Sequence, residues 1–296
     1  MKWVASQALE ALVGNLVMGK LVNRDYESTF QNGGSTVTVA IPTPMTTNNM
    51  LETGTVNLQN PSVGTAQIVL DKHREASFSI SNVAQILTAP DLVVMNMKES
   101  IIAIAEAIET DLLSLYPLFT YNAALGGTTA LTEATVDTAE TNLWAAKVPK
   151  SQKLNLVCAG SAYSSLRQIS SFRDWTGIGP NVGVGTAPAM TGMLAGPTGD
   201  GHVKGFDVYR SQYVPKSGST NYNLAFSKDA VGLVVRKLAP PIVGSGAIAE
   251  YAEMGDFAVR VVTTYNGNAL AQQFTVDVLY GVAAFRQNFA QVVESN

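Results

Sequence analysis

Carboxylates gathered on one predicted helix are the side chains of this chain that could do general acid–base chemistry: Glu99, Glu106, Glu109 and Asp111. They fall on or beside the polar side of that helix. A helix face that is solvated, or that forms salt bridges between subunits, has the same composition. The chain carries neither a G-x-S-x-G elbow nor a Walker-type phosphate loop to accompany them. We therefore interpret the four carboxylates as a polar helix face and predict no catalytic residue.

Two further groups could hold a metal ion or a cofactor. Asp200, His202 and Asp207 could gather around an ion, but the chain has only 2 histidines and the stretch is typical of a solvated loop. Gly177-Ile178-Gly179 followed by Gly183 has some likeness to a dinucleotide loop. However, a proline follows it, no strand precedes it and the glycine spacing is off by one. We predict no metal site and no cofactor.

Basic residues suggest two kinds of contact. Lys147, Lys150 and Lys153 form a small cluster without interleaved aromatic residues, which could face nucleic acid or an acidic neighbour, or could be an ordinary solvated turn. The formal net charge of −4 excludes a basic footprint over the whole chain. Any surface that touches nucleic acid would therefore be local.

Three arginines interrupt apolar strands: Arg236, Arg260 and Arg286. A guanidinium in such a place usually requires a carboxylate or carbonyl partner. We predict pairing between subunits or between domains, and the alternative is an arginine of an edge strand that is exposed to water.

These residues must be positioned by elements, and the most informative element is a long hairpin. Between Ser35 and Leu70 the only charged residue is Glu52. Residues 36–41 and 66–70 alternate as strands do, and the prolines between them indicate irregular structure. Because a two-stranded ribbon is marginally stable alone, we expect it to lie on another protein surface. Candidate contacts between subunits at its far end are Met50, Leu51 and Glu52.

The composition supports assembly. Charged residues make up 14% of the 296-residue chain, against roughly 25% in an average soluble domain, so we expect much surface to be buried between subunits. The single cysteine, Cys158, cannot form an intrachain disulfide and fits a reducing compartment. The chain shows no signal-peptide core and no run of roughly 20 apolar residues, which predicts a cytosolic protein without a membrane span.

The remaining patterns give an α+β fold. Residues 3–22 predict an amphipathic arm, and residues 89–116 predict one long helix of roughly 40 Å. A helix over 132–147, a strand over 154–159 and a helix over 161–169 follow. Strands over 257–265 and 272–285 are joined at Asn266-Gly267, which is typical of a type I′ turn.

This order of elements resembles the major capsid (coat) proteins of tailed bacteriophages, which have the Hong Kong 97-type, or HK97-like, fold. The resemblance covers nearly the whole chain and includes several short stretches: Asn15-Leu16-Val17, Leu21 to Tyr26, Val69 to His73, Ala105 to Asp111, Gly205 to Tyr209, Ala225 to Ala230 and Asp277 to Gly281. It points to the coat-protein branch in which some members carry an extra inserted domain. Here the connection from Val214 to Leu224 is too short for that insertion.

The resemblance implies a division of the chain. Residues 1–34 would be the N-terminal arm, and residues 35–85 would be the hairpin, called the E-loop, with its flanking strands. Residues 86–118 and 249–296 would form the peripheral (P) domain with its spine helix. Residues 119–248 would form the axial (A) domain. Some members crosslink an E-loop lysine to a neighbour's asparagine, but no lysine lies between Lys20 and Lys72, so we expect no covalent crosslink.

The resemblance also implies a function. The chain would assemble as pentamers and hexamers into an icosahedral shell around double-stranded DNA, inside the host cytoplasm, and would remain in the virion. Expected partners are other copies of the chain, a scaffolding protein, the portal, a decoration protein and DNA bound without sequence specificity. The alternatives are an encapsulin-type compartment with the same fold and, less favoured, a nucleotide-using α/β enzyme.

Overall fold

The computed structural model describes residues 16–27, 34–42, 45–50, 52, 54–60, 62–87, 92–121, 129–169, 201–242, 244–254 and 257–296. Most of the predicted arm over 3–22 and the glycine-rich segment around Gly177 therefore lie outside the described residues, as do Asp200 and Leu51. Within the arm, the described part contains one helical turn, α2 (Met18–Leu21).

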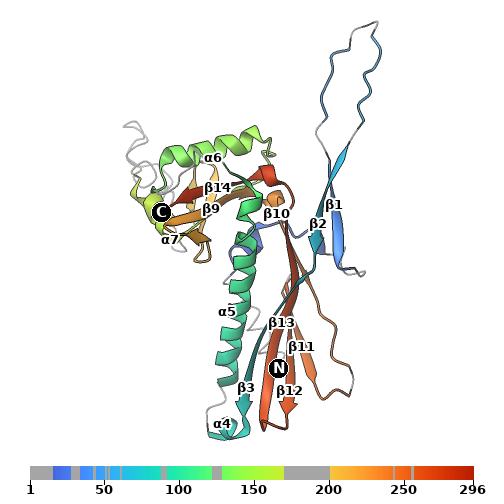
Figure 1. Ribbon diagram of the computed structural model, residues 1–296, viewed down its shortest axis with the longest axis vertical. Helices are drawn as coiled ribbons and strands as arrows, with labels where there is room; N and C mark the ends of the chain where they lie inside the picture. The colour runs from blue at the N-terminus through green and yellow to red at the C-terminus, as the bar shows by residue number, and fades with distance from the viewer. Residues whose placement is uncertain are drawn as a thin grey trace, which may run out of the picture.

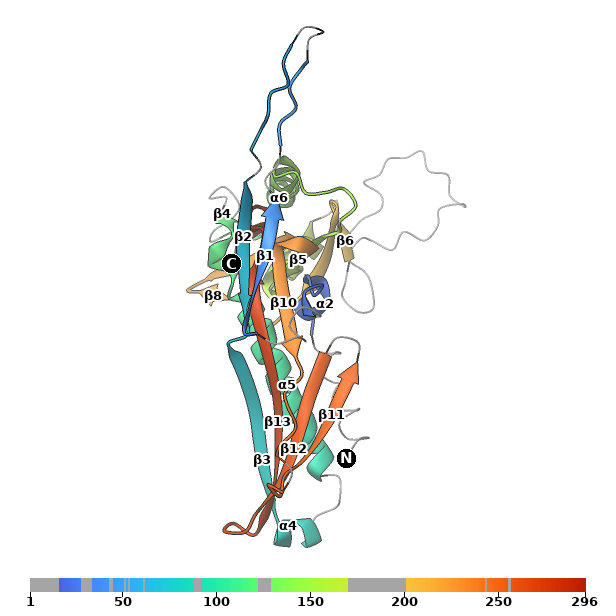
Figure 2. The ribbon, with the colours of Figure 1, turned by 90° about the vertical axis from the view of Figure 1, so that its right-hand side faces the viewer.

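A long helix packed on a sheet forms one part of the molecule. The helix is α5 (Leu92–Leu113), preceded by α4 (Asn82–Leu87). Along the sheet the strand order is β10 (Val231–Arg236), β13 (Ala271–Ala284), β12 (Phe257–Asn266) and β11 (Ile248–Met254), and β3 (Lys72–Ser81) pairs with the other side of β13. Figures 1 and 2 show α5 running along one face of this sheet. Apolar helix side chains that point at the sheet are fully buried: Met97, Ile101, Ile104, Ile108 and Leu112. This spacing of three and four residues is what made the helix predictable from the sequence.

A second sheet forms the other part of the molecule. Its order is β4 (Thr120–Tyr121), β14 (Ala290–Ser295), β9 (Thr220–Ser227), β5 (Leu154–Cys158), β7 (Phe206–Arg210) and β6 (Gly201–Val203), and β8 (Lys216–Ser217) pairs with β9. Helices α6 (Glu133–Ala145) and α7 (Gly160–Gln168) lie beside it in Figure 1. Strand β5 is buried along its whole length, as its apolar run predicted.

The predicted hairpin forms the third sheet, from β1 (Thr36–Pro42) and β2 (Val63–Val69). The strands are antiparallel with Thr36 opposite Val69 and Pro42 opposite Val63. Beyond this short ladder the two arms extend away from the rest of the molecule, as Figure 1 shows. The α+β fold and the hairpin are thus confirmed.

Three details depart from the sequence-based picture. Strand β10 lies in the sheet with α5, and β14 crosses into the second sheet, where it pairs with β9. The predicted division at 248/249 groups Val231–Arg236 with the axial residues and Ala290–Ser295 with the peripheral residues, and the strand pairing does not follow that grouping, because pairing between strands distant in sequence leaves no local pattern. As a division into domains it stays a prediction. The reversal after Asn266 takes four residues, since Asn266 pairs with Ala271 and Leu270 has φ 46°, so the type I′ prediction was wrong. The Asn266 side chain accepts hydrogen bonds from the next backbone N–H groups, which favours this wider loop.

Candidate assembly surface

The base of the hairpin is fastened to the body of the molecule by a small apolar cluster. Its buried members come from the hairpin, from β10 and from the end of β13: Val39, Ile68, Val234, Ala283 and Phe285. Tyr26, in the segment that follows α2, packs edge-on against Phe285 with ring centroids 5.3 Å apart. The cluster fixes the direction in which the two arms leave the body.

A glycine in β13 allows this close packing. A Cβ added to Gly281 would lie 2.2 Å from the carbonyl oxygen of Val69, at the end of β2. No real Cβ contact is so short, so any larger residue would push the hairpin strand away. A glycine inside a strand is a known sign of close backbone approach, and this is the signal by which Gly281 could have been found.

Beyond the base, the arms have little support from the rest of the described chain. They are joined by the side chain of Gln59, which accepts a hydrogen bond from the backbone N–H of Thr46 at 3.1 Å and donates one to its carbonyl oxygen. Apolar side chains on the arms and on β2 are largely exposed: Met45, Met50, Val56, Leu58 and Val63. Leu58 reaches 87% exposure. A projecting ribbon with exposed apolar side chains and one charge, Glu52, is suited to lie on a second protein surface.

The carboxylates of α5 divide into exposed and buried groups, which corrects the prediction of one solvated or intersubunit face. Glu99 is exposed as expected, whereas Glu109 is buried against the segment that contains α2. Glu106 lies between these extremes and accepts a hydrogen bond from the Tyr213 hydroxyl at 2.6 Å, which raises the pKa of Tyr213 to about 12. The sequence could not show this difference, because the covering segments are distant along the chain.

Asp111 joins α5 to the sheet. Its carboxylate lies 3.4 Å from the ammonium group of Lys72 and 3.2 Å from the guanidinium of Arg74, and it accepts a hydrogen bond from the Tyr280 hydroxyl. Burial acts to raise the pKa of Asp111, but the Tyr280 hydrogen bond and the two cations outweigh it and hold the pKa below its ordinary value. The charged carboxylate therefore stabilises the contact between helix and sheet.

Two of the three arginines predicted to need a carboxylate or carbonyl partner have one among the described residues, and Arg286 has a ring contact instead. Arg260 forms a two-pronged ion pair with buried Asp277 on the adjacent strand, and Asp277 also lies 3.1 Å from the His73 ring. Arg236 donates to the carbonyl oxygen of Gly34 at 3.0 Å, and the guanidinium of Arg286 lies 4.9 Å from the Phe289 ring centre. Contacts of these arginines with a neighbouring subunit stay a prediction.

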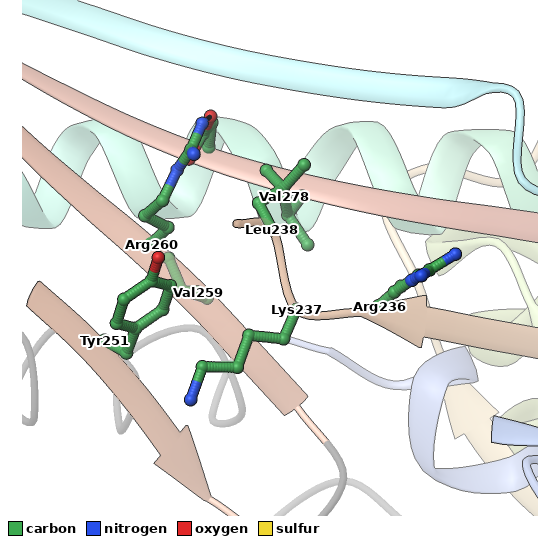
Figure 3. Close-up of a pocket in the computed structure, with 8 residues that line it drawn as sticks. Arg236, Lys237, Leu238, Tyr251, Val259, Arg260 and Val278 are labelled. Atoms are coloured by element: carbon green, nitrogen blue, oxygen red, sulfur yellow. Dashed lines mark hydrogen bonds and ion pairs between the residues drawn. The ribbon is translucent and has the colours of Figure 1, made fainter. Parts of the chain in front are cut away.

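Arg236 and Arg260 also line a small pocket, shown in Figure 3. In that view Arg260 lies near Tyr251, and Arg236 points away from both. The Lys237 ammonium group lies 4.6 Å from the Tyr251 ring centre. Because the cations do not converge on one point and the space between them is small, the pocket is no candidate for binding an anion.

The predicted basic cluster lies at the end of α6 and before β5. Lys147, Lys150 and Lys153 are all exposed. Lys153 is 3.8 Å from Asp207, whose carboxylate also contacts His202 at 3.0 Å. The cluster is thus partly neutralised, and its role toward nucleic acid or a neighbour stays a prediction.

Metal-binding groups and membrane-spanning helices are both absent from the part of the chain that the structure describes. There, no group of three or more His, Cys, Asp or Glu side chains is placed to hold a metal ion. Among the same residues, no helix is long and apolar enough to cross a membrane.

Comparison with solved structures identifies the fold. A chain from a structure described as Mycobacterium phage Che8 superposes with a TM-score of 0.68 and 16% identity over 95% of this chain and 91% of the other. The capsid structure of cyanophage P-SCSP1u superposes with a TM-score of 0.61 and 13% identity, over 89% of this chain and 84% of the other. The capsid of a native GTA particle superposes with a TM-score of 0.60 and 13% identity, over 93% of this chain and 91% of the other. Neither a family model nor a curated sequence matches the chain.

These similarities cover nearly whole chains on both sides. The chain therefore has the fold of phage capsid subunits, which confirms the HK97-like fold expected from the sequence. At identities of this size the likeness establishes the fold alone.

Proposed function

We propose that this chain is the major capsid protein of a tailed bacteriophage and assembles with copies of itself into an icosahedral shell. The observation that carries the proposal is the projecting hairpin in a chain with a capsid fold. Its exposed apolar side chains are not covered by the rest of the described chain, and a neighbouring copy would bury them. Repeated over a closed shell, many such weak contacts sum to a stable container.

The finer parts of the proposal follow from the same role. Subunits would form pentamers and hexamers, and the shell would enclose double-stranded DNA by contacts without sequence specificity. A scaffolding protein during assembly, a portal and a decoration protein would be further partners. Assembly would take place in the host cytoplasm, and the role would require no catalysis.

The experiment is negative-stain electron microscopy with light scattering on the chain expressed alone and with its neighbouring genes. Closed shells or rings of capsomer size are the expected result. A monomer under both conditions would contradict the proposal. Shells that enclose a protein cargo in place of DNA would favour the encapsulin-type alternative.

A paired substitution tests whether the hairpin carries assembly. Leu58→Ser removes the most exposed large apolar side chain among the described residues of the ribbon, and Ile242→Ser, at 85% exposure, is the matched change away from it. We expect the first variant to lower the yield of particles and the second to retain it. Equal loss in both variants would show that the hairpin has no special part.

A further inference from the structure

A buried carboxylate joins the described N-terminal segment to the spine helix. Glu109 of α5 is 1% exposed. Its Oε1 accepts a hydrogen bond from the backbone N–H of Met18 at 2.7 Å and another from Val17. Val17 is the N-cap of α2 and Met18 is its first residue, so a single carboxylate holds the start of that turn against α5.

The second oxygen of the same carboxylate lacks a partner. Glu109 Oε2 is buried, and no hydrogen bond reaches it from the described residues. A buried ionised carboxylate usually requires a cation or several donors. The N–H groups of Met18, Val17 and Gly19 favour the ionised form, whereas the burial of the carboxyl group and its unpaired second oxygen favour the neutral acid.

The charged and titratable groups around Glu109 do not change this balance. Lys20, on α2, is exposed and favours the ionised form only weakly. Glu106, one turn earlier on α5, is engaged by the Tyr213 hydroxyl from the segment after β7. On the sheet side, Lys72 and Arg74 of β3 and Tyr280 of β13 engage Asp111. Burial therefore outweighs the backbone donors and raises the pKa of Glu109 to about 7.

The segment held by Glu109 continues to the base of the hairpin. Asn23 pairs with β10, donating to the carbonyl oxygen of Val231 and accepting from the N–H of Leu233, both at 2.9 Å. Tyr26, three residues further on, packs on Phe285 in the apolar cluster that fastens the hairpin. One continuous stretch of chain thus connects the spine helix to the hairpin base.

We propose that Glu109 is a proton-dependent latch, in which the neutral carboxyl holds residues 16–22 against the spine helix and the ionised carboxylate releases them. When the segment separates from α5, water reaches the carboxylate, and the pKa of Glu109 returns toward its ordinary value. Docking of the segment is therefore coupled to the uptake of one proton. The hairpin base, at the far end of the same stretch, is the part of the molecule positioned to respond.

The direction of the effect follows from linkage. A group whose pKa is raised in the docked state contributes fully at acidic pH, and its contribution is lost as pH rises through the docked-state value. Docking is expected to weaken by up to about tenfold for each pH unit between the ordinary pKa of a glutamate and about pH 7, and to change little above that.

The test is amide hydrogen exchange by mass spectrometry on assembled particles, from about pH 5 to about pH 8. The probes are the amides of residues 17–22 in the wild type and in Glu109→Gln, which is neutral at every pH and keeps an acceptor oxygen. Because both proteins share the intrinsic pH dependence of exchange, the ratio of their rates reports the latch. We expect wild-type exchange to accelerate relative to the variant as pH rises toward 7.

The matched control is Glu99→Gln, which removes a charge from an exposed position on the same helix. The ratio of wild-type exchange to exchange in this control should not change with pH. If Glu109→Gln fails to assemble, the wild type alone suffices. Its exchange at residues 17–22, divided by that of β9 and β14 and corrected for intrinsic rates, should still rise with pH. A ratio that stays constant with pH in either comparison would overturn the proposal.

Discussion

At the scale of single residues, Gly281 is a position on which we expect the direction of the hairpin to depend. We predict that Gly281→Ala destabilises the chain by about 1–3 kcal/mol, because the new methyl group would meet the Val69 carbonyl oxygen and force the backbones apart. Thermal unfolding and the yield of closed particles would measure the effect, and the yield should fall more than stability alone explains.

The control for this change is Gly160→Ala. Gly160 begins α7, and a Cβ there meets nothing within 4 Å. It should leave both stability and particle yield close to those of the wild type. If Gly281→Ala behaved in the same way, the close approach of β2 and β13 would not set the hairpin direction.

The Arg260 and Asp277 pair is the second residue-scale feature with a clear expectation. Asp277→Asn leaves the largely buried guanidinium of Arg260 with a neutral partner and a carbonyl oxygen. Since removing one member of a buried pair costs more than the pair contributes, we expect a loss of about 3 kcal/mol or more. Arg260→Met with Asp277→Asn should recover part of it in chemical denaturation. A single variant as stable as the wild type would contradict the argument.

At the scale of elements, the spine helix carries two carboxylates with opposite responses to pH. Asp111, held ionised by Tyr280, Lys72 and Arg74, has a lowered pKa. Its contribution is therefore present above the pKa of the unfolded chain and is lost as pH falls through the folded value. Glu109, two residues earlier, weakens its contact as pH rises.

We predict that Asp111→Asn lowers stability by about 1–3 kcal/mol at neutral pH, since it removes the charged acceptor from three contacts. The free energies of unfolding of wild type and variant should become equal in strongly acidic solution, because the aspartate is then protonated and neutral like the asparagine. Thermal unfolding measured across pH would show this. The control is Glu99→Gln, at an exposed position, which should not change stability at neutral pH or in strong acid. A difference that persists unchanged into strong acid would exclude the charge as its cause.

The elements themselves were predictable to different degrees, for physical reasons. The alternation of residues 36–41 and the helical spacing from Met97 to Leu112 are local patterns, and the structure confirms both elements. The pairing of β14 with β9 and the burial of Glu109 arise from segments distant in sequence, which no local period encodes. For the same reason, the sequence predicted the ribbon itself but left the glycine beneath its base unrecognised as a support.

At the scale of the whole molecule, the chain combines a well-packed body with a projecting ribbon. The body buries most large apolar side chains in one continuous core that includes α5 and both large sheets. The described residues of the far arms contribute nothing to that core, and their apolar side chains are exposed. With the proposed function, folding of the subunit and assembly of a shell would therefore depend on separable parts of the chain.

Shortening the ribbon tests this separation. We predict that replacing residues 50–54 by a short turn leaves the thermal stability of the subunit nearly unchanged, because the far arms lie outside both apolar clusters. The same variant should form no closed shells, since the surface that reaches a neighbour has been removed. Circular dichroism with size-exclusion chromatography and light scattering separates the two outcomes. Particles like those of the wild type would show that assembly depends on the body alone, whereas an unfolded subunit would show that the ribbon stabilises the body from which it projects.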